Sequence, residues 1–260
     1  MSTGLDRKIV LITGASGGIG EGTALHFAAQ GSKLSLVARR KDELERVATA
    51  CKLLGAQDVI ISPQDLSQGE GCADCIQDTV EHFGGLDVFI NNAGVMYGQN
   101  MMNVTPEIFD HSMSLNAHTA LRMTQDATAY LSKSKNNPAI VNVSSIAGLR
   151  AFPGALAYKM SKAALDQLTR CSALELISKG IRVNSVNPGV IETDLFRNAG
   201  MSDSSSQTYL NRAKKTHPIG RPGRVDEVAK VIAFLASDDA SLLVGQTISV
   251  DGGRSITVPY

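Results

Sequence analysis

Short apolar runs alternate with longer amphipathic stretches along the 260 residues of the chain. The runs are rich in Val and Ile and predict buried strands. They lie at 8–15, 33–38, 57–62, 86–94, 139–145, 181–189 and 246–253. Helix-like stretches fill the intervals, and those at 18–31, 41–55 and 71–85 end in glycine, which commonly terminates helices. Pro106 opens a further helix, to about Lys133, with proline at its first turn.

This regular alternation of strand and helix is typical of a doubly wound α/β domain, with about seven parallel strands and helices on both faces. No Pro/Gly/Ser-rich linker divides the chain, so we expect one domain over residues 1–260. The one irregular segment is 192–218, which contains "GMSDSSSQ" with Phe196, Tyr209 and Leu210. A loop of that length in a compact domain is usually functional or mobile. We therefore expect 192–218 to form a lid over a substrate site.

Charge and composition exclude several classes of partner. Lys+Arg 25 balances Asp+Glu 25, so nothing indicates nucleic-acid binding. The first residues carry no signal-like apolar run, and no segment offers the roughly 18 apolar residues of a membrane span. Cys72 and Cys75 form a lone C-x-x-C without a second pair or nearby histidines at ligand spacing. We expect no metal, reduced thiols and a cytoplasmic location.

A glycine-rich turn lies directly between the first predicted strand and the first predicted helix. "TGASGGIG" at 13–20 places Gly14, Gly18 and Gly20 with the spacing G-x-x-x-G-x-G. Such a turn brings backbone N–H groups and a helix N-terminus against a pyrophosphate, which side chains would block. Glycine-rich turns also occur without nucleotides, but this position favours dinucleotide binding.

The end of the second predicted strand discriminates between cofactors. An acid there would bind a ribose 2′-hydroxyl, whereas an arginine would accommodate a 2′-phosphate. The chain reads "LVARRK", with Ala38 where an acid would stand, followed by Arg39 and Arg40. Guanidinium groups match phosphate geometry. Two solvated arginines are the alternative, but the pattern favours NADP(H) over NAD(H).

Tyr158 and Lys162 lie four residues apart in "AYKMSKAAL", on one face of a helix expected to run to about Lys179. Such a pair is common by chance and also fits an ordinary surface helix. Ser145, thirteen residues before Tyr158, ends the strand at 139–145. Parallel sheets place ligand sites beyond the carboxyl ends of their strands. Four residues fall at such ends, namely Gly14, Asn91, Ser145 and Pro188.

The sequence resembles the short-chain dehydrogenases/reductases in their single-domain, Rossmann-like form. The resemblance covers essentially the whole chain and shows no departure at a catalytic position. It rests on "TGASGGIG", "DLS" at 65–67, "NNAG" at 91–94, Asn116, Ser145, "YKMSK", "NPGVIET" at 187–193 and "DGG" at 251–253.

The resemblance implies a role for each matching position. Asn116, Ser145, Tyr158 and Lys162 would form the catalytic tetrad. The phosphates would lie against Gly14, Ser16, Gly18, Ile19 and Gly20, and the 2′-phosphate against Arg39 and Arg40. The adenosine side would be bordered by Asp65, Leu66, Asn92, Ala93 and Gly94. The nicotinamide end would meet Pro188, Gly189, Val190, Ile191 and Thr193, with Tyr158 and Lys162 at its ribose.

The activity implied is hydride transfer between NADP(H) and a carbonyl or secondary alcohol. A free tyrosine has a pKa of about 10, and a nearby ammonium favours phenolate and lowers that pKa. Tyr158 would be the general acid, tuned by Lys162, while Ser145 steadies the substrate oxygen. Asn116 would hold a water that connects Lys162 to solvent.

The expected pocket walls are largely apolar and comprise Met96, Tyr97, Leu149, Phe152, Phe196 and Met201. They suit a 3-oxoacyl thioester, a steroid-like ketone, a terpenoid or a xenobiotic ketone, and nothing ranks these. The resemblance further implies a homotetramer, or failing that a dimer, assembled through the helices at 106–133 and 158–179. The alternative functions are an inactive relative that binds nucleotide and acts by protein association, and a nucleotide-binding scaffold without a substrate crevice.

Overall fold

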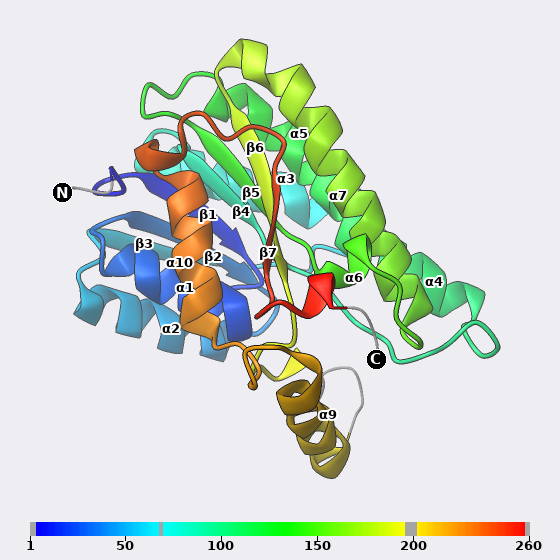
Figure 1. Cartoon of the computed structure of the whole chain (residues 1–260). Coiled ribbons are helices and arrows are strands. Elements are labelled where there is room, and N and C mark those ends of the chain that lie inside the picture. Colours follow the sequence, from blue (N-terminus) through cyan, green and yellow to red (C-terminus); the bar gives the residue numbers. More distant parts are fainter. Residues whose placement is uncertain (1–3, 68–69, 196–201, 258–260) are drawn as a thin grey trace.

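The computed structural model of the chain describes residues 4–67, 70–195 and 202–257. At its centre is a seven-stranded parallel sheet with the strand order β3-β2-β1-β4-β5-β6-β7 (Figure 1). The strands are β1 (Ile9–Thr13), β2 (Lys33–Ala38), β3 (Asp58–Pro63), β4 (Val88–Asn91), β5 (Ala139–Val143), β6 (Arg182–Pro188) and β7 (Thr247–Val250). Apart from their ends they coincide with the predicted apolar runs, so the predicted α/β fold is confirmed.

Helices cover both faces of the sheet (Figure 1). One face carries α1 (Gly18–Ala28), α2 (Lys41–Leu54) and α10 (Val225–Ala236); the other carries α3 (Glu70–Phe83), α4 (Pro106–Met113), α5 (Thr119–Leu131) and α7 (Leu156–Leu176). Successive strand side chains point to opposite faces. Val10 and Ile12 accordingly pack in the core with α1 and α10, and Leu11 packs in the core with α3 and α5.

The strand order reverses beside β1, which lies between β2 and β4. In open parallel sheets a ligand crevice forms at this switch point, beyond the carboxyl ends of the strands. Gly14 follows β1 and Asn92 follows β4, so the glycine turn and the "NNAG" motif meet there. Two further helices lie near the same edge, the short α6 (Ile146–Leu149) after β5 and α9 (Asp203–Thr216) after β6.

The segment 192–218 is more regular than its sequence indicates, because it contains the helix α9. Figure 1 shows α9 beyond the end of the sheet, away from the main body of the molecule. Its outer face is polar, and only Ala213 is fully buried among its described side chains. A helix with so few buried positions has little apolar periodicity to reveal it. The expectation of an irregular segment was wrong, while the lid role stays a prediction; Phe196 and Met201 lie outside the described residues.

The two cysteines of the C-x-x-C motif lie in the core of the protein. Cys72 and Cys75 are buried on α3, and the Cys75 thiol bonds to the Cys72 carbonyl oxygen at 3.3 Å. Burial raises the pKa of both thiols. Within the described ranges, no group of three His, Cys, Asp or Glu side chains could hold a metal ion. No helix in the same ranges is long and apolar enough to cross a membrane.

Candidate active site

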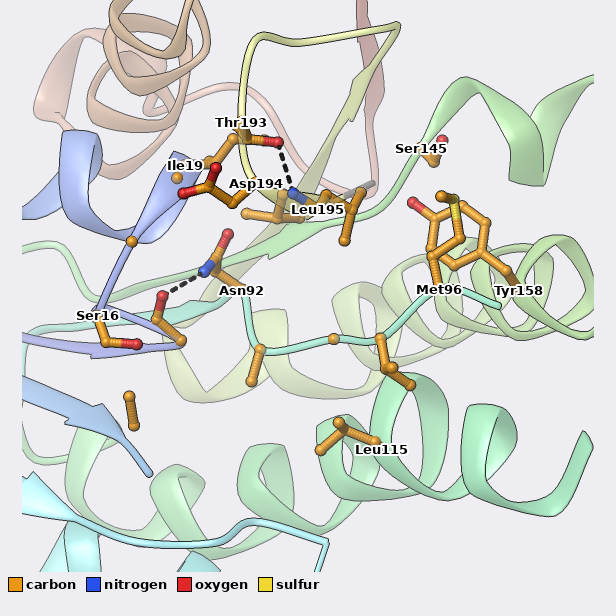
Figure 2. A pocket seen from close by; sticks show the side chains of 18 of the residues that line it. Ser16, Ile19, Asn92, Met96, Leu115, Ser145, Tyr158, Thr193, Asp194 and Leu195 are labelled. Carbon is orange, nitrogen blue, oxygen red and sulfur yellow. Dashed lines mark hydrogen bonds between the residues drawn. The ribbon is translucent and has the colours of Figure 1, made fainter. Parts of the chain in front are cut away.

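A cavity of about 490 Å³ opens beyond the carboxyl ends of β1, β4 and β5. In Figure 2, Ser16, Ile19 and Asn92 lie toward one end, and Ser145 and Tyr158 lie together at the other. Most residues predicted for the site line it, namely Gly14, Ser16, Gly18, Ile19, Arg39, Arg40, Asp65, Leu66, Asn92, Ala93, Gly94, Ser145, Tyr158, Lys162, Pro188, Gly189, Ile191 and Thr193. Gly20, Asn116 and Val190, also predicted for the site, do not line the cavity.

The glycine turn requires its glycines. Gly14 has a φ of +66°, and a Cβ placed on Gly20 would collide with the Gly14 carbonyl oxygen. The α1 helix therefore begins directly against the cavity, and no side chain caps its N-terminus. Uncapped backbone N–H groups and the positive end of the helix dipole form an anion-binding site. This end of the cavity is suited to a pyrophosphate.

Thr13 fixes the "NNAG" segment to the glycine turn, a role that the sequence analysis missed. Its hydroxyl oxygen accepts hydrogen bonds from the backbone N–H groups of Asn92 at 2.9 Å and Ala93 at 3.0 Å. The Asn92 amide donates back to the Thr13 carbonyl at 2.8 Å. Only a hydroxyl at the end of β1 signals this role in the sequence, because its partners lie about eighty residues further along the chain.

The end of β2 places two cations at the edge of the cavity. Arg39 and Arg40 are exposed and line it together with Ala38, which is buried. The Arg40 guanidinium donates to the Ser16 carbonyl oxygen at 3.2 Å and hydroxyl at 3.3 Å. Arg40 thus borders the glycine turn directly. A ribose bound next to the turn would therefore meet guanidinium groups, and it would meet no carboxylate at position 38.

At the other end of the cavity, Ser145 and Tyr158 come from different elements. Ser145 follows β5 and caps α6, where its hydroxyl oxygen accepts from the Ala147 N–H at 3.1 Å. Tyr158 lies in the first turn of α7. Desolvation raises the pKa of the Tyr158 phenol to about 12, and the Ser145 hydroxyl opposes this rise. The two hydroxyls therefore face one reaction space.

Lys162 lies one turn beyond Tyr158 on α7 and is 4% exposed. Its ammonium donates to the Val143 carbonyl oxygen at 2.8 Å and lies 5.8 Å from the centroid of the Tyr158 ring. Desolvation lowers the pKa of Lys162 to about 8, and Asp166 opposes this shift. The expectation that Lys162 lowers the pKa of Tyr158 is not met in this arrangement, because burial of the phenol outweighs every other influence on it.

Asn116 lies in a π-helical turn, η1 (Ser114–His118), that joins α4 to α5. Such turns are rare and occur frequently at functional sites. The Asn116 side chain accepts from the Val95 N–H at 2.7 Å and donates to the Val95 carbonyl at 2.8 Å and the Ser161 hydroxyl at 2.9 Å. A Cβ placed on Gly94 would lie 3.1 Å from Asn116 Oδ1 and 3.5 Å from Lys162 Nζ. Asn116 thus holds the wall beside Lys162, and its water-binding role stays a prediction.

Only some of the residues expected to form the walls of the substrate pocket line the cavity. Met96 and Tyr97 line the cavity, together with Leu115 and Leu195, which the sequence did not single out. Leu149 and Phe152 do not line it. The Phe152 ring is instead covered by the Arg254 guanidinium, 4.9 Å from its centroid, so the C-terminal segment holds it.

Comparison with known proteins agrees with this geometry. The family model described as enoyl-(acyl carrier protein) reductase matches residues 14–255. The 3-oxoacyl-[acyl-carrier-protein] reductase of Thermotoga maritima is 35% identical over 253 residues, which cover 97% of this chain and 99% of that protein. The glucose 1-dehydrogenase of Gluconobacter oxydans is 34% identical over 250 residues, covering 96% and 92%.

A solved structure is similarly close. A short-chain dehydrogenase/reductase of unknown function from Caenorhabditis elegans, crystallised with cofactor, superposes with a TM-score of 0.92 at 35% identity, covering 98% of this chain and 97% of that one. The fold, the cavity and these matches together define a hydride-transfer oxidoreductase that uses a nicotinamide cofactor. The chain belongs to the short-chain dehydrogenase/reductase family.

Proposed function

We propose that the chain is an NADP(H)-dependent dehydrogenase/reductase that acts on a carbonyl or secondary alcohol of a largely apolar substrate. One observation carries this proposal. The hydroxyls of Ser145 and Tyr158 and the ammonium of Lys162 gather at one end of a cavity whose other end holds the glycine turn and two arginines. A dinucleotide laid from the turn toward α7 would bring its reactive ring beside these three groups.

The residues divide the chemistry between them. The nicotinamide supplies or accepts the hydride when it is bound. The Tyr158 phenol, whose pKa burial raises to about 12, is protonated at neutral pH and donates its proton to the carbonyl oxygen during reduction. The Ser145 hydroxyl donates a hydrogen bond to the same oxygen and stabilises the charge that develops there. Lys162, protonated below about pH 8, holds the ribose and attracts the phenolate left behind.

Cofactor choice provides the direct test. We expect NADPH to bind well ahead of NADH, and Arg39→Asp to reverse that order. A hydrogen bond to a charged group contributes enough that its loss should weaken NADPH binding by about 10- to 100-fold. Titration calorimetry with both cofactors measures the effect, and Arg7→Asp, at an exposed site remote from the cavity, is the matched control. Equal affinities for NADPH and NADH in the unmodified protein would contradict the assignment.

The substrate class rests on the apolar part of the lining. Met96, Leu115, Ile191 and Leu195 line the cavity, and Figure 2 shows Met96 beside Tyr158. This favours an apolar carbonyl compound, such as a 3-oxoacyl thioester or a steroid-like, terpenoid or xenobiotic ketone. The names of the two relatives span an acyl thioester and a sugar, so they do not rank these candidates. A panel of ketones scored by kcat/KM would rank them.

Assembly into a homotetramer, or failing that a dimer, belongs to the same proposal. Large apolar side chains are exposed on the two helices expected to pair, with Leu121 on α5 and Leu174 on α7. Ile177, directly after α7, is also exposed. Apolar side chains that recur along neighbouring helices are typical of a surface that contacts another chain, which supports the assembly.

A further inference from the structure

Asp166 is a buried carboxyl that the proposed mechanism leaves unused. It lies on α7, one turn after Lys162, and is 1% exposed. Its Oδ1 accepts a hydrogen bond from the Asn187 amide at 2.9 Å. Its Oδ2 is buried and has no hydrogen-bond partner within the described residues. An unpaired buried polar atom of this kind costs stability and is rare in native proteins, so its retention requires an explanation.

The contacts of this carboxyl lead to the catalytic end of the cavity. The Asn187 amide that donates to Asp166 also donates to the Ser145 carbonyl oxygen at 3.0 Å. Asn187 directly precedes Pro188, which lines the cavity. On the other side, a Cβ placed on Gly148 would collide with Asp166 Oδ2, so the carboxyl is packed tightly against α6. Asp166 therefore joins three segments that border the cavity: α7, the end of β5 and the end of β6.

The charge of Asp166 acts on Lys162. Burial lowers the pKa of the Lys162 ammonium to about 8, and Asp166 is the charged group that opposes this shift. Burial also raises the pKa of the Asp166 carboxyl, against the hydrogen bond from Asn187, the nearby Ser144 hydroxyl and the charges of Lys162 and Arg170. An ionised Asp166 therefore stabilises the protonated form of Lys162.

Several elements surround the pair, and most of the groups that they contribute are uncharged. β6 contributes Asn187, the residue after β5 contributes Ser144, whose hydroxyl donates to the Lys162 carbonyl at 3.2 Å, and α6 contributes backbone. Arg170 is on α7 itself. The titratable side chains that line the cavity beside Lys162 also include Tyr158, Tyr97, His111 and Asp194, and Tyr209 of α9 acts on Tyr158. Among the described residues, Asp166 is the anion whose charge acts on Lys162.

We propose that Asp166 is a positioning residue for the reaction: its carboxylate keeps Lys162 protonated, and through Asn187 it fixes the carbonyl of Ser145. The inference rests on the proposed function, because it assigns Asp166 a part in that reaction. Asp166 itself touches neither cofactor nor substrate. A carboxyl that only filled space in the core could be replaced by its isosteric amide without a change in how the site titrates.

The test is the pH dependence of cofactor binding, which needs no substrate. In the unmodified protein, affinity for NADPH should fall as pH rises through about 8, because Lys162 loses the proton with which it holds the ribose. In Asp166→Asn and Asp166→Ala this fall should begin at lower pH. At pH 8 both variants should bind NADPH about tenfold more weakly than the unmodified protein, as expected for a lost charged hydrogen bond, and at acidic pH equally well.

Thr169→Val is the matched control. Thr169 is buried on the same helix and accepts a hydrogen bond from Asn142 at 2.9 Å, without contact to Ser145 or Lys162. The Thr169→Val variant should have lower thermal stability, and its NADPH affinity should depend on pH as in the unmodified protein. Once a substrate is known, kcat should fall by about 10- to 100-fold in Asp166→Ala, the cost of slight misplacement of reacting groups, and less in Asp166→Asn, which retains an acceptor for Asn187.

Three results would overturn the inference. The first is a pH profile of Asp166→Asn that superposes on that of the unmodified protein, and the second is an equal displacement in Thr169→Val. The third is failure of both Asp166 variants to fold, which would make the residue structural. Absence of NADPH and NADH binding in the unmodified protein would instead refute the proposed function itself, and this inference with it.

Discussion

Tyr158 and Lys162 share a buried environment, and burial shifts the pKa of each residue in the direction that favours its uncharged form. Burial raises the pKa of the phenol to about 12 and lowers that of the ammonium to about 8. At neutral pH the pair is therefore a neutral phenol beside a protonated lysine. This state is ready to donate a proton in reduction. Oxidation of an alcohol needs the phenolate, so the oxidative rate should rise with pH.

Tyr158→Phe tests the phenol directly. The variant should lose at least about 10²-fold in kcat, as expected for removal of a general acid. Binding of NADPH should remain nearly intact, because the hydroxyl faces the reacting oxygen rather than the phosphates. Steady-state kinetics and calorimetry measure the two effects. Tyr130→Phe is the control, since that hydroxyl bonds to Gln77 on the far side of the molecule. Retention of more than about a tenth of kcat in Tyr158→Phe would reject the assignment.

At the scale of single residues, local motifs predicted the groups that border the cavity and missed those that support them. Tyr158, Lys162 and the glycine turn are recognisable because their spacing in the sequence is fixed by one helix or one turn. Thr13 and Asp166 act on partners 79 and 21 residues away, and only the folded sheet brings these together. From the sequence alone, an Asp in a helix is expected to be exposed to solvent, and only the structure shows that Asp166 is buried.

At the scale of elements, the strands β1, β2, β4 and β5 were predictable because they are buried on both faces and are rich in apolar residues. The helix α9 was not, because it buries too little to show periodicity. Its C-terminal end is nevertheless anchored. His217, directly after α9, is 3% exposed, and its Nε2 accepts a hydrogen bond from the Val190 N–H at 3.2 Å. The end of α9 is thereby tied to the segment 188–191, of which Pro188, Gly189 and Ile191 line the cavity.

This anchor should depend on pH. Nε2 can accept from Val190 only when the imidazole is neutral, and burial lowers the pKa of His217 below its usual 6.5. Because the folded-state pKa is depressed, the anchor should be complete above pH 6.5 and lost as pH falls through the folded value. Hydrogen exchange at Val190, followed between about pH 5 and 8, should show faster exchange in acid.

Two variants decide whether His217 is responsible. His217→Gln keeps a polar side chain but cannot titrate, so the acid-dependent increase in exchange at Val190 should disappear. His82→Gln removes the exposed imidazole that pairs with Asp58 at 2.7 Å and should leave the increase unchanged. An increase that persists in His217→Gln would show that another group controls the anchor.

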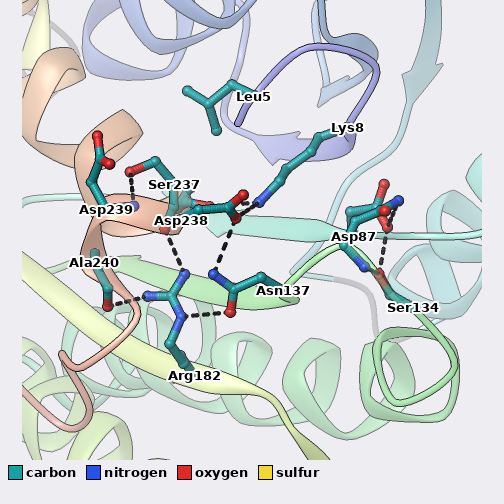
Figure 3. A network of polar contacts seen from close by, with 12 residues as sticks. Leu5, Lys8, Asp87, Ser134, Asn137, Arg182, Ser237, Asp238, Asp239 and Ala240 are labelled. Atoms are coloured by element: carbon teal, nitrogen blue, oxygen red, sulfur yellow. Dashed lines mark hydrogen bonds and ion pairs between the residues drawn. The ribbon is translucent and has the colours of Figure 1, made fainter. Parts of the chain in front are cut away.

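At the scale of the whole molecule, the two ends of the sheet differ in role. The carboxyl ends of the strands open into the cavity, whereas the amino ends are closed by the polar network of Figure 3. There Arg182, at the start of β6, donates to the carbonyls of Leu235 at 2.8 Å, Ala240 at 3.0 Å and Ser237 at 3.1 Å. Lys8, just before β1, pairs with Asp238 at 3.1 Å. The network joins the strands to the end of α10.

Arg182→Met should therefore affect stability and not function. The side chain is 2% exposed, and its loss leaves buried carbonyls without a donor. Each unsatisfied buried group costs about 1–3 kcal/mol, so we expect a loss of about 3 kcal/mol or more. In a chain of this size that lowers Tm by roughly 6–12 °C, measurable by calorimetry. Arg7→Met, at an exposed arginine, should leave Tm unchanged.

Cofactor binding separates this expectation from a general loss of the fold. Arg182 lies at the opposite end of β6 from Pro188, which lines the cavity. Below its Tm, the Arg182→Met variant should therefore bind NADPH with the affinity of the unmodified protein. Weaker binding at an unchanged Tm would contradict the division between a stabilising end and a catalytic end. An unchanged Tm with unchanged binding would show that water replaces the guanidinium at little cost.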